Sequence, residues 1–181
     1  MENTATGRSQ RSGMMTGLFT DKDSTEGAYK SLRDRGYSDD EINVLMSDKT
    51  RDNYYANDPD SELGNKTLEG TGVGSAVGGT IGAIVGGIAA IGTNLVLPGL
   101  GLVVWGPVAA ALAGAGAGGL TGGLVGALIG HGIPEDDAKR YEEGINNGGV
   151  VMGVTPRSDE DATYLANDWT TNYKGEYVNR Y

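Results

Sequence analysis

The sequence predicts an α+β fold in which two βαβ halves make a ferredoxin-like sandwich, split by an inserted helical hairpin of the glycine-zipper type. Two observations lead to this prediction. Strand, helix and strand patterns precede a central stretch, and helix, strand, helix and strand patterns follow it. The central stretch, from Gly70 to Pro134, contains no Asp, Glu, Lys or Arg. The predicted parts are a flexible tail at 1–13, the first half at 14–66, the hairpin at 67–133 and the second half at 134–181.

The first half contains one strand–helix–strand unit. Residues 14–20 fit a strand, and the apolar positions within 24–35 recur at helical spacing. Gly36 then ends the helix, and 41–47 alternates as a second strand. The stretch 48–66 is polar and rich in Asn and Asp, so we expect an acidic connector there.

Glycine recurs at every fourth position in two ladders within the charge-free stretch. Each glycine costs a solvated helix about 1 kcal/mol against alanine, so such helices need packing to compensate. A spacing of four puts the glycines on one helix face, which a second backbone can approach closely. We expect helix packing and oligomerisation at these glycines: Gly70, Gly74, Gly78, Gly82, Gly86, Gly114, Gly118, Gly122, Gly126 and Gly130.

The two arms of this hairpin are long enough to cross a bilayer. Helices over 71–97 and 108–130 would measure about 40 and about 35 Å, against a hydrocarbon core of about 30 Å. The link between them is uncharged, and Trp105 within it suits a membrane interface. Because Lys66 and Lys139 lie beyond the outer ends, the positive-inside rule places both termini in the cytoplasm.

A soluble assembly is the alternative to the bilayer. The arms hold many glycine and alanine residues, so their hydrophobicity per residue is modest. Two hairpins that are apolar on all sides can also bury each other within a cytoplasmic filament or shell. The sequence leaves both arrangements open.

The second half begins at Pro134. Proline at the first position and acidic residues in the first turn favour a helix start, and this helix extends to about residue 147. Gly148 and Gly149 end it. The remaining elements are a strand at 150–155, a helix at 159–172 and a strand at 176–180.

The composition argues against several classes of function. The 181 residues carry a formal net charge of −10, whereas nucleic-acid phosphates call for Lys and Arg. The chain has no Cys and a single His, His131, which argues against a cysteine nucleophile, a Cys-type zinc site and a Ser-His triad. We therefore expect no enzymatic activity, no cofactor, no metal site and no nucleic-acid partner.

Two short patterns resemble ligand sites. The GxGxxG pattern at 114–119 lies inside a glycine ladder and lacks a nearby acid, so helix packing explains it better than a dinucleotide does. Asp58, Asp60, Glu62 and Glu69 match positions 1, 3, 5 and 12 of a calcium loop, but the required glycine comes one place late. A solvated acidic loop is the default interpretation, and calcium binding at 58–69 stays open.

Several segments resemble the general-stress-protein, or heat-induced-stress-protein, domain of bacteria. They are TGLFTD at 16–21, INVLM at 42–46, AAALAGAGAG at 109–118, GHGIPEDDA at 130–138 and GGVV at 148–151. The resemblance covers about residues 14–155 and implies a bacterial origin and a stress-linked role. It supplies no reaction, cofactor or catalytic residue.

Together these features predict a non-enzymatic, stress-associated bacterial protein that assembles with itself through glycine-zipper helices. The preferred site of assembly is the inner membrane, where the lipid bilayer would be a second partner. The alternative is a soluble structural protein that polymerises in the cytoplasm with its hairpins buried.

Overall fold

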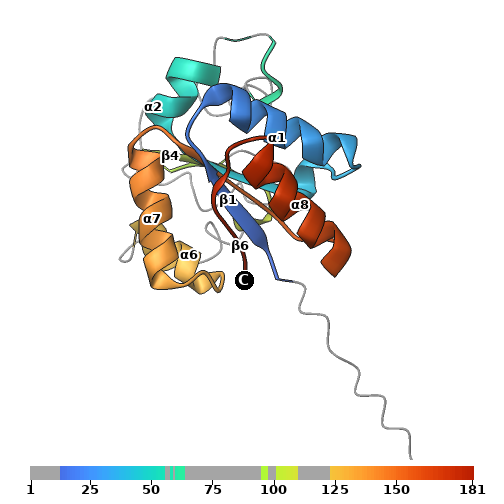
Figure 1. Ribbon diagram of the computed structural model, residues 1–181. Helices are drawn as coiled ribbons and strands as arrows, with labels where there is room; N and C mark the ends of the chain where they lie inside the picture. The colour runs from blue at the N-terminus through green and yellow to red at the C-terminus, as the bar shows by residue number, and fades with distance from the viewer. Residues whose placement is uncertain (1–12, 56–57, 59, 64–94, 98–100, 110–122) are drawn as a thin grey trace, which may run out of the picture.

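A computed structural model of the chain shows an antiparallel sheet with helices packed on both faces (Figure 1). The α+β class predicted from the sequence is therefore confirmed. Apart from Gly13, the predicted tail lies outside the described part of the chain. The structure describes residues 13–55, 58, 60–63, 95–97, 101–109 and 123–181.

The first half folds as the predicted strand–helix–strand unit. The Asp21 carboxylate caps the first helix by accepting a hydrogen bond from the backbone N–H of Ser24 at 2.8 Å. Gly36 follows the helix in the left-handed conformation, with φ of 85°. The elements are β1 (Met15–Phe19), α1 (Lys22–Asp34), a 3-10 turn (Asp39–Glu41), β2 (Ile42–Ser47), α2 (Asp48–Thr50) and a π-helical turn (Arg51–Tyr55).

The second half also follows its predicted element order. Pro134 precedes a helix whose first turn carries three acidic residues, and the Ser158 hydroxyl caps the next helix by accepting the N–H of Asp161 at 3.0 Å. The elements are α7 (Glu135–Asn146), β5 (Val150–Val154), α8 (Asp159–Thr171) and β6 (Glu176–Arg180).

The sheet has the strand order β3-β4-β2-β5-β1-β6, in which β3 is Leu95–Leu97 and β4 is Leu102–Trp105. Each neighbouring pair runs antiparallel. Strand β5 lies between β1 and β2, so Val151 is opposite both Leu18 and Leu45. The second half of the chain thereby supplies the strand that joins the two strands of the first half.

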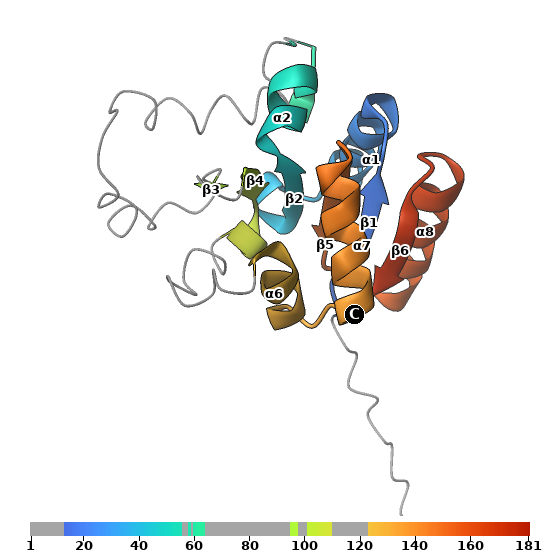
Figure 2. The same ribbon diagram turned by 90° about the vertical axis from the view of Figure 1, so that its left-hand side faces the viewer.

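Alternate strand residues face two separate cores, one on each side of the sheet. Helices α1 and α8 cover one side, and α7 covers the other together with α6 (Gly123–Gly130) (Figure 2). This alternation follows from the two-residue repeat of a strand. The first core includes Phe19, Leu32, Val44, Met152, Leu165 and Trp169. The second core includes Leu18, Leu45, Val104, Leu128, Tyr141 and Val151.

The structure corrects one part of the predicted hairpin. Residues 95–97, expected at the end of a helical arm, form β3, and the expected link contains β4. Trp105 is only 3% exposed and belongs to the first core, so its predicted place at a membrane interface is wrong. The apolar run from Leu102 to Trp105 pairs with β2 instead, because that pairing satisfies its backbone groups and buries its side chains on both faces.

The rest of the predicted hairpin is described only in part. Helix α6 confirms helical structure at the end of the second arm, whereas 64–94 and 110–122 lie outside the described residues. Among the helices that are described, none has the length and apolarity that a bilayer crossing requires.

Two glycines that flank β4 provide a test of its packing. Gly101 and Gly106 both have positive φ, of 63° and 90°, so alanine at either costs about 1–2 kcal/mol. A Cβ at Gly106 would also overlap the carbonyl oxygen of Ile42, whereas one at Gly101 meets no atom of the described part of the chain within 4 Å. We expect Gly106→Ala to lower the free energy of unfolding by about 1–3 kcal/mol more than Gly101→Ala. Urea unfolding followed by circular dichroism would measure this difference, and equal losses would contradict the packing of β4 on β2.

Candidate functional site

Within the charge-free stretch, a tight turn follows β4 and lies against β2. Gly106 approaches the backbone of β2 so closely that a side chain there would overlap the Ile42 carbonyl. The Asn43 side chain, 3% exposed, accepts the N–H of Val108 at 2.7 Å and donates to the carbonyl of Gly153 at 3.3 Å. A buried amide thus links β2, β5 and the turn at 107–109, which fixes where the chain leaves the sheet.

Helix α6 lies near the C-terminal end of the charge-free stretch and packs on the domain. Its Leu124 and Leu128 are buried in the second core. Gly126 and Gly130 are exposed, and a Cβ built on either meets no atom of the described residues within 4 Å. Ile129, beside them, is 43% exposed. The helix therefore packs on the domain through its bulky side and leaves its glycine side open.

Of the ten glycines predicted to pack helices, the structure describes Gly126 and Gly130. Both lie on α6, four residues apart and on one face, as their spacing requires. Their role in oligomerisation stays a prediction. The other eight lie outside the described residues: Gly70, Gly74, Gly78, Gly82, Gly86, Gly114, Gly118 and Gly122.

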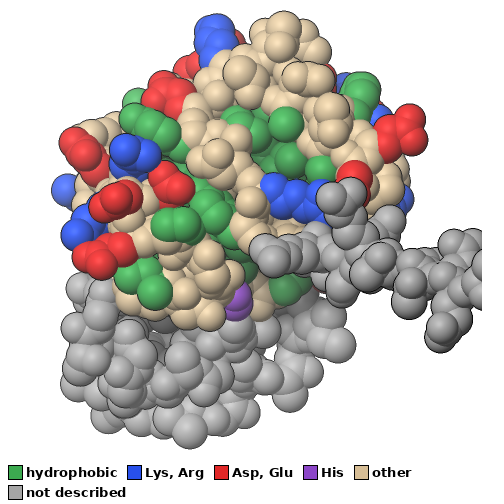
Figure 3. All heavy atoms as spheres, turned by 60° about the horizontal axis from the view of Figure 1, so that its bottom comes forward, with side chains coloured by type: hydrophobic (Ala, Val, Ile, Leu, Met, Phe, Trp, Pro, Cys, Tyr) green, Lys and Arg blue, Asp and Glu red, His purple; other side chains and the backbone are tan. Residues whose placement is uncertain are grey.

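Figure 3 shows the end of the domain that carries the turn between α6 and α7. Hydrophobic side chains gather in the middle of this view, with charged side chains around them. The single histidine, purple in the figure, is exposed in this turn, and its backbone N–H donates to the Leu128 carbonyl at 3.0 Å. Across the described residues, no group of three or more His, Asp or Glu could hold a metal ion.

The acidic connector at 48–66 contacts α1 through the Asp58 carboxylate and the Ser61 hydroxyl. Asp58 forms an ion pair with Lys22 and accepts the N–H of Asp60 at 3.0 Å. Ser61 donates a hydrogen bond to Glu26, a half-buried carboxylate whose pKa is raised mainly by burial. The carboxylate expected first in a calcium loop is thus engaged within the chain, and Glu69 lies outside the described residues.

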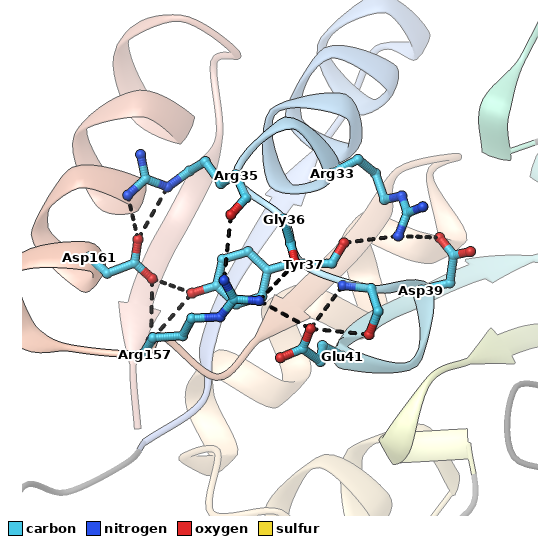
Figure 4. A network of polar contacts seen from close by, with 9 residues as sticks. Arg33, Arg35, Gly36, Tyr37, Asp39, Glu41, Arg157 and Asp161 are labelled. Carbon is cyan, nitrogen blue, oxygen red and sulfur yellow. Dashed lines mark hydrogen bonds and ion pairs between the residues drawn. The ribbon is translucent and has the colours of Figure 1, made fainter.

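A polar network connects the two halves of the domain at one end of the sheet (Figure 4). Asp161, in the first turn of α8, lies at its centre. Its carboxylate accepts hydrogen bonds from the Arg35 guanidinium at 2.6 and 3.1 Å, from the Tyr37 hydroxyl, and from the backbone N–H of Arg157 at 3.2 Å. One carboxylate therefore binds the loop that follows α1 and the loop that precedes α8.

Arg157 completes the network from the second half. Its guanidinium lies 4.3 Å from the centre of the Tyr37 ring, donates to the Gly36 carbonyl at 2.8 Å and pairs with Glu41 at 3.3 Å. Glu41 also accepts the N–H of Ser38 at 2.8 Å, the main reason its pKa is lowered. Each described cation of this network faces a carboxylate, a carbonyl or a ring.

The ionisation of the network suits a structural role. Burial acts to raise the pKa of Asp161, but hydrogen bonds from Tyr37 and Arg35 outweigh it and the pKa lies below its usual value. Burial, with the bond to Asp161, raises the pKa of Tyr37 to about 12. A phenol that stays neutral and a carboxylate with a lowered pKa are both weak general bases near neutral pH. We conclude that the network holds the two halves together.

Sequence reasoning missed this network. Ser158 and Asp161 show the spacing of a helix start, but Arg35 and Tyr37 lie more than 120 residues away. No local pattern indicates which distant side chains such a carboxylate will contact. Comparison of the chain with protein-family models, curated proteins and solved structures found no match.

Asp161 and Asp159 provide a matched pair for testing the network. Both lie in the first turn of α8, but the Asp161 side chain is 12% exposed and the Asp159 side chain is 74% exposed. We expect Asp161→Asn to lower the free energy of unfolding by about 1–3 kcal/mol, because several charged hydrogen bonds weaken. Asp159→Asn, which removes an exposed pair with Arg180, should cost at most about 1 kcal/mol.

The pH dependence of stability offers a second readout of the same pair. Because the folded pKa of Asp161 is lowered, its stabilisation is present above its unfolded pKa of 3.8 and is lost as pH falls through the folded value. The difference in unfolding free energy between wild type and Asp161→Asn should therefore shrink below about pH 4. Urea titrations at pH 7, 5, 4 and 3 measure it, and a constant difference would contradict the assignment.

Proposed function

We propose that this chain is a non-enzymatic protein that associates with copies of itself. The α+β domain is the scaffold, and the charge-free stretch is the associating part. The observation that carries the proposal is the orientation of α6, which buries Leu124 and Leu128 and leaves Gly126 and Gly130 open. A bare glycine face is costly in water unless another backbone packs on it, and a second copy carries the same face.

The scaffold is, we infer, of the ferredoxin-like kind. Helix α1 connects β1 to β2, and α8 connects β5 to β6. The strands of the two units interleave in the order β2-β5-β1-β6. This interleaving supports the expected pairing of two βαβ halves. The β3–β4 hairpin then extends the sheet beside β2, and α6 and α7 are additions on the second face.

The assembly forms without a bilayer. In a membrane hairpin, the link between the arms would lie across the hydrocarbon core from the domain, about 30 Å away. Strand β4 lies within that link, and it pairs with β2 from Val44 to Ser47. This pairing supports the cytoplasmic assembly and argues against an inner-membrane location.

A stress-linked role in bacteria is part of the proposal. Its support is the resemblance of 16–21, 42–46 and 130–138 to the general-stress-protein domain. Within these segments, 16–19 belong to β1 and 42–46 form most of β2, and both strands pair with β5. In this proposal the associating chains respond to stress as an assembly and carry out no reaction.

Substitution of the open glycines tests the proposed function. We expect the double variant Gly126→Leu, Gly130→Leu to lose most of its oligomer, because two large side chains would fill the close-packing face. The monomer should remain at least as stable, since leucine favours a helix over glycine by up to about 1 kcal/mol and nothing lies within 4 Å. Size-exclusion chromatography with light scattering measures the mass, and thermal unfolding measures the stability.

The matched control is Glu143→Leu, which puts the same side chain on an exposed position of α7. It should leave the oligomer unchanged. A wild-type chain that stays monomeric at 100 μM or above would contradict self-association. Ultracentrifugation of cell extracts tests the location, and a chain that only detergent releases from the pellet would contradict assembly without a bilayer.

A further inference from the structure

The two edges of the sheet differ in how well they are protected against another strand. Strands β6 and β3 form the edges, on opposite sides of the sheet (Figure 2). An edge strand offers unpaired N–H and C=O groups to any extended chain, and proteins usually protect such edges with charge, bulges or strong twist. The residues of β6 and β3 can be compared on that basis.

Strand β6 is well protected. Its register on β1 shifts between Thr16 and Leu18, because one extra residue lies in β6. Tyr177 has φ of 49°, which is rare outside glycine, and its carbonyl accepts the Tyr141 hydroxyl at 2.7 Å. Glu176 and Arg180 add charge at the two ends of the strand. A bulged, charged strand of this kind is a poor template for another strand.

Strand β3 has none of these features. Leu95, Val96 and Leu97 carry no charge, and the nearest charged residues in the sequence are Glu69 and Glu135. Its register on β4 is regular, with Val96 opposite Val103. Among the described strands, β3 pairs with β4 alone. The edge is thus uncharged, regular and unbulged.

Electrostatics favours a second copy of this chain as the occupant of that edge. Two copies with a net charge of −10 each repel wherever their acidic surfaces approach. Pairing along β3 brings together two uncharged strands that lie within the charge-free stretch, so no carboxylate on either strand opposes the contact. An antiparallel pair of identical strands also satisfies two-fold symmetry, the commonest symmetry of protein dimers.

We infer that two copies of the chain pair through β3, edge to edge and antiparallel, to form one continuous sheet across the dimer. This inference rests on the proposed self-association and names a contact that is separate from the glycine face of α6. Helix packing through Gly126 and Gly130 would then join such dimers into larger assemblies.

Disulfide trapping tests the β3 contact, because the natural chain contains no cysteine. Directly opposite residues of antiparallel strands lie about 4.5–5.5 Å apart between Cα atoms, within the range that a disulfide spans. We expect Val96→Cys to form a covalent dimer with oxidised glutathione, at least tenfold faster than the control Asn179→Cys on β6. Non-reducing gels give the rates. Equal rates, or a Val96→Cys chain that stays monomeric where the wild type associates, would overturn the inference.

A charge substitution separates this contact from the proposed function. Val96→Lys should raise the dimer dissociation constant at least tenfold in sedimentation velocity, whereas Asn179→Lys should leave it unchanged. If Gly126→Leu, Gly130→Leu breaks the assembly and Val96→Lys does not, the β3 contact is wrong and the proposed function stands. If the wild type does not associate, both fail. Should Val96→Lys unfold, the milder cysteine variant still decides the question.

Discussion

The structure depends on the placement of β5 between β1 and β2. This strand is paired along its whole length, with residues 15–19 on one side and 42–46 on the other. Its residues Val150 to Val154 are all buried, with Val150, Met152 and Val154 in the first core and Val151 in the second. Because the strand comes from the second half of the chain, neither half can complete the sheet alone. The network around Asp161 also connects the two halves, through hydrogen bonds between the C-terminal end of α1 and the N-terminal end of α8.

The sequence predicts the elements of both halves well, because each has a local signal. The predicted strand at 150–155 is β5 at Val150–Val154, and the predicted helix at 159–172 is α8 at Asp159–Thr171. Strand β4 falls in the stretch expected as the link between two helical arms, although Val103 and Val104 are typical strand residues. Contacts such as Arg35 to Asp161 depend on tertiary structure, so no spacing in the sequence indicates them.

The division of charge along the chain gives the molecule two kinds of surface. The α+β domain carries many acidic residues. Near the ends of α1 and α8, arginine side chains pair with two of these carboxylates, those of Asp161 and Glu41. The charge-free stretch contributes β4 to the sheet and α6 to the second core, so it is partly folded into the domain. The exposed glycine side of α6 and the sequence of β3 are both uncharged. In the proposed assembly, this distribution would keep acidic domains apart and let uncharged surfaces meet.

Strand β4 makes the charge-free stretch part of the folded sheet. Hydrogen exchange of the full chain, followed by mass spectrometry, tests it most directly. The account predicts that the backbone amides of Val103 and Val104 exchange as slowly as those of Val44 and Val151, in one cooperative unit. Rapid exchange across 102–105, with β2 and β5 still protected, would contradict it.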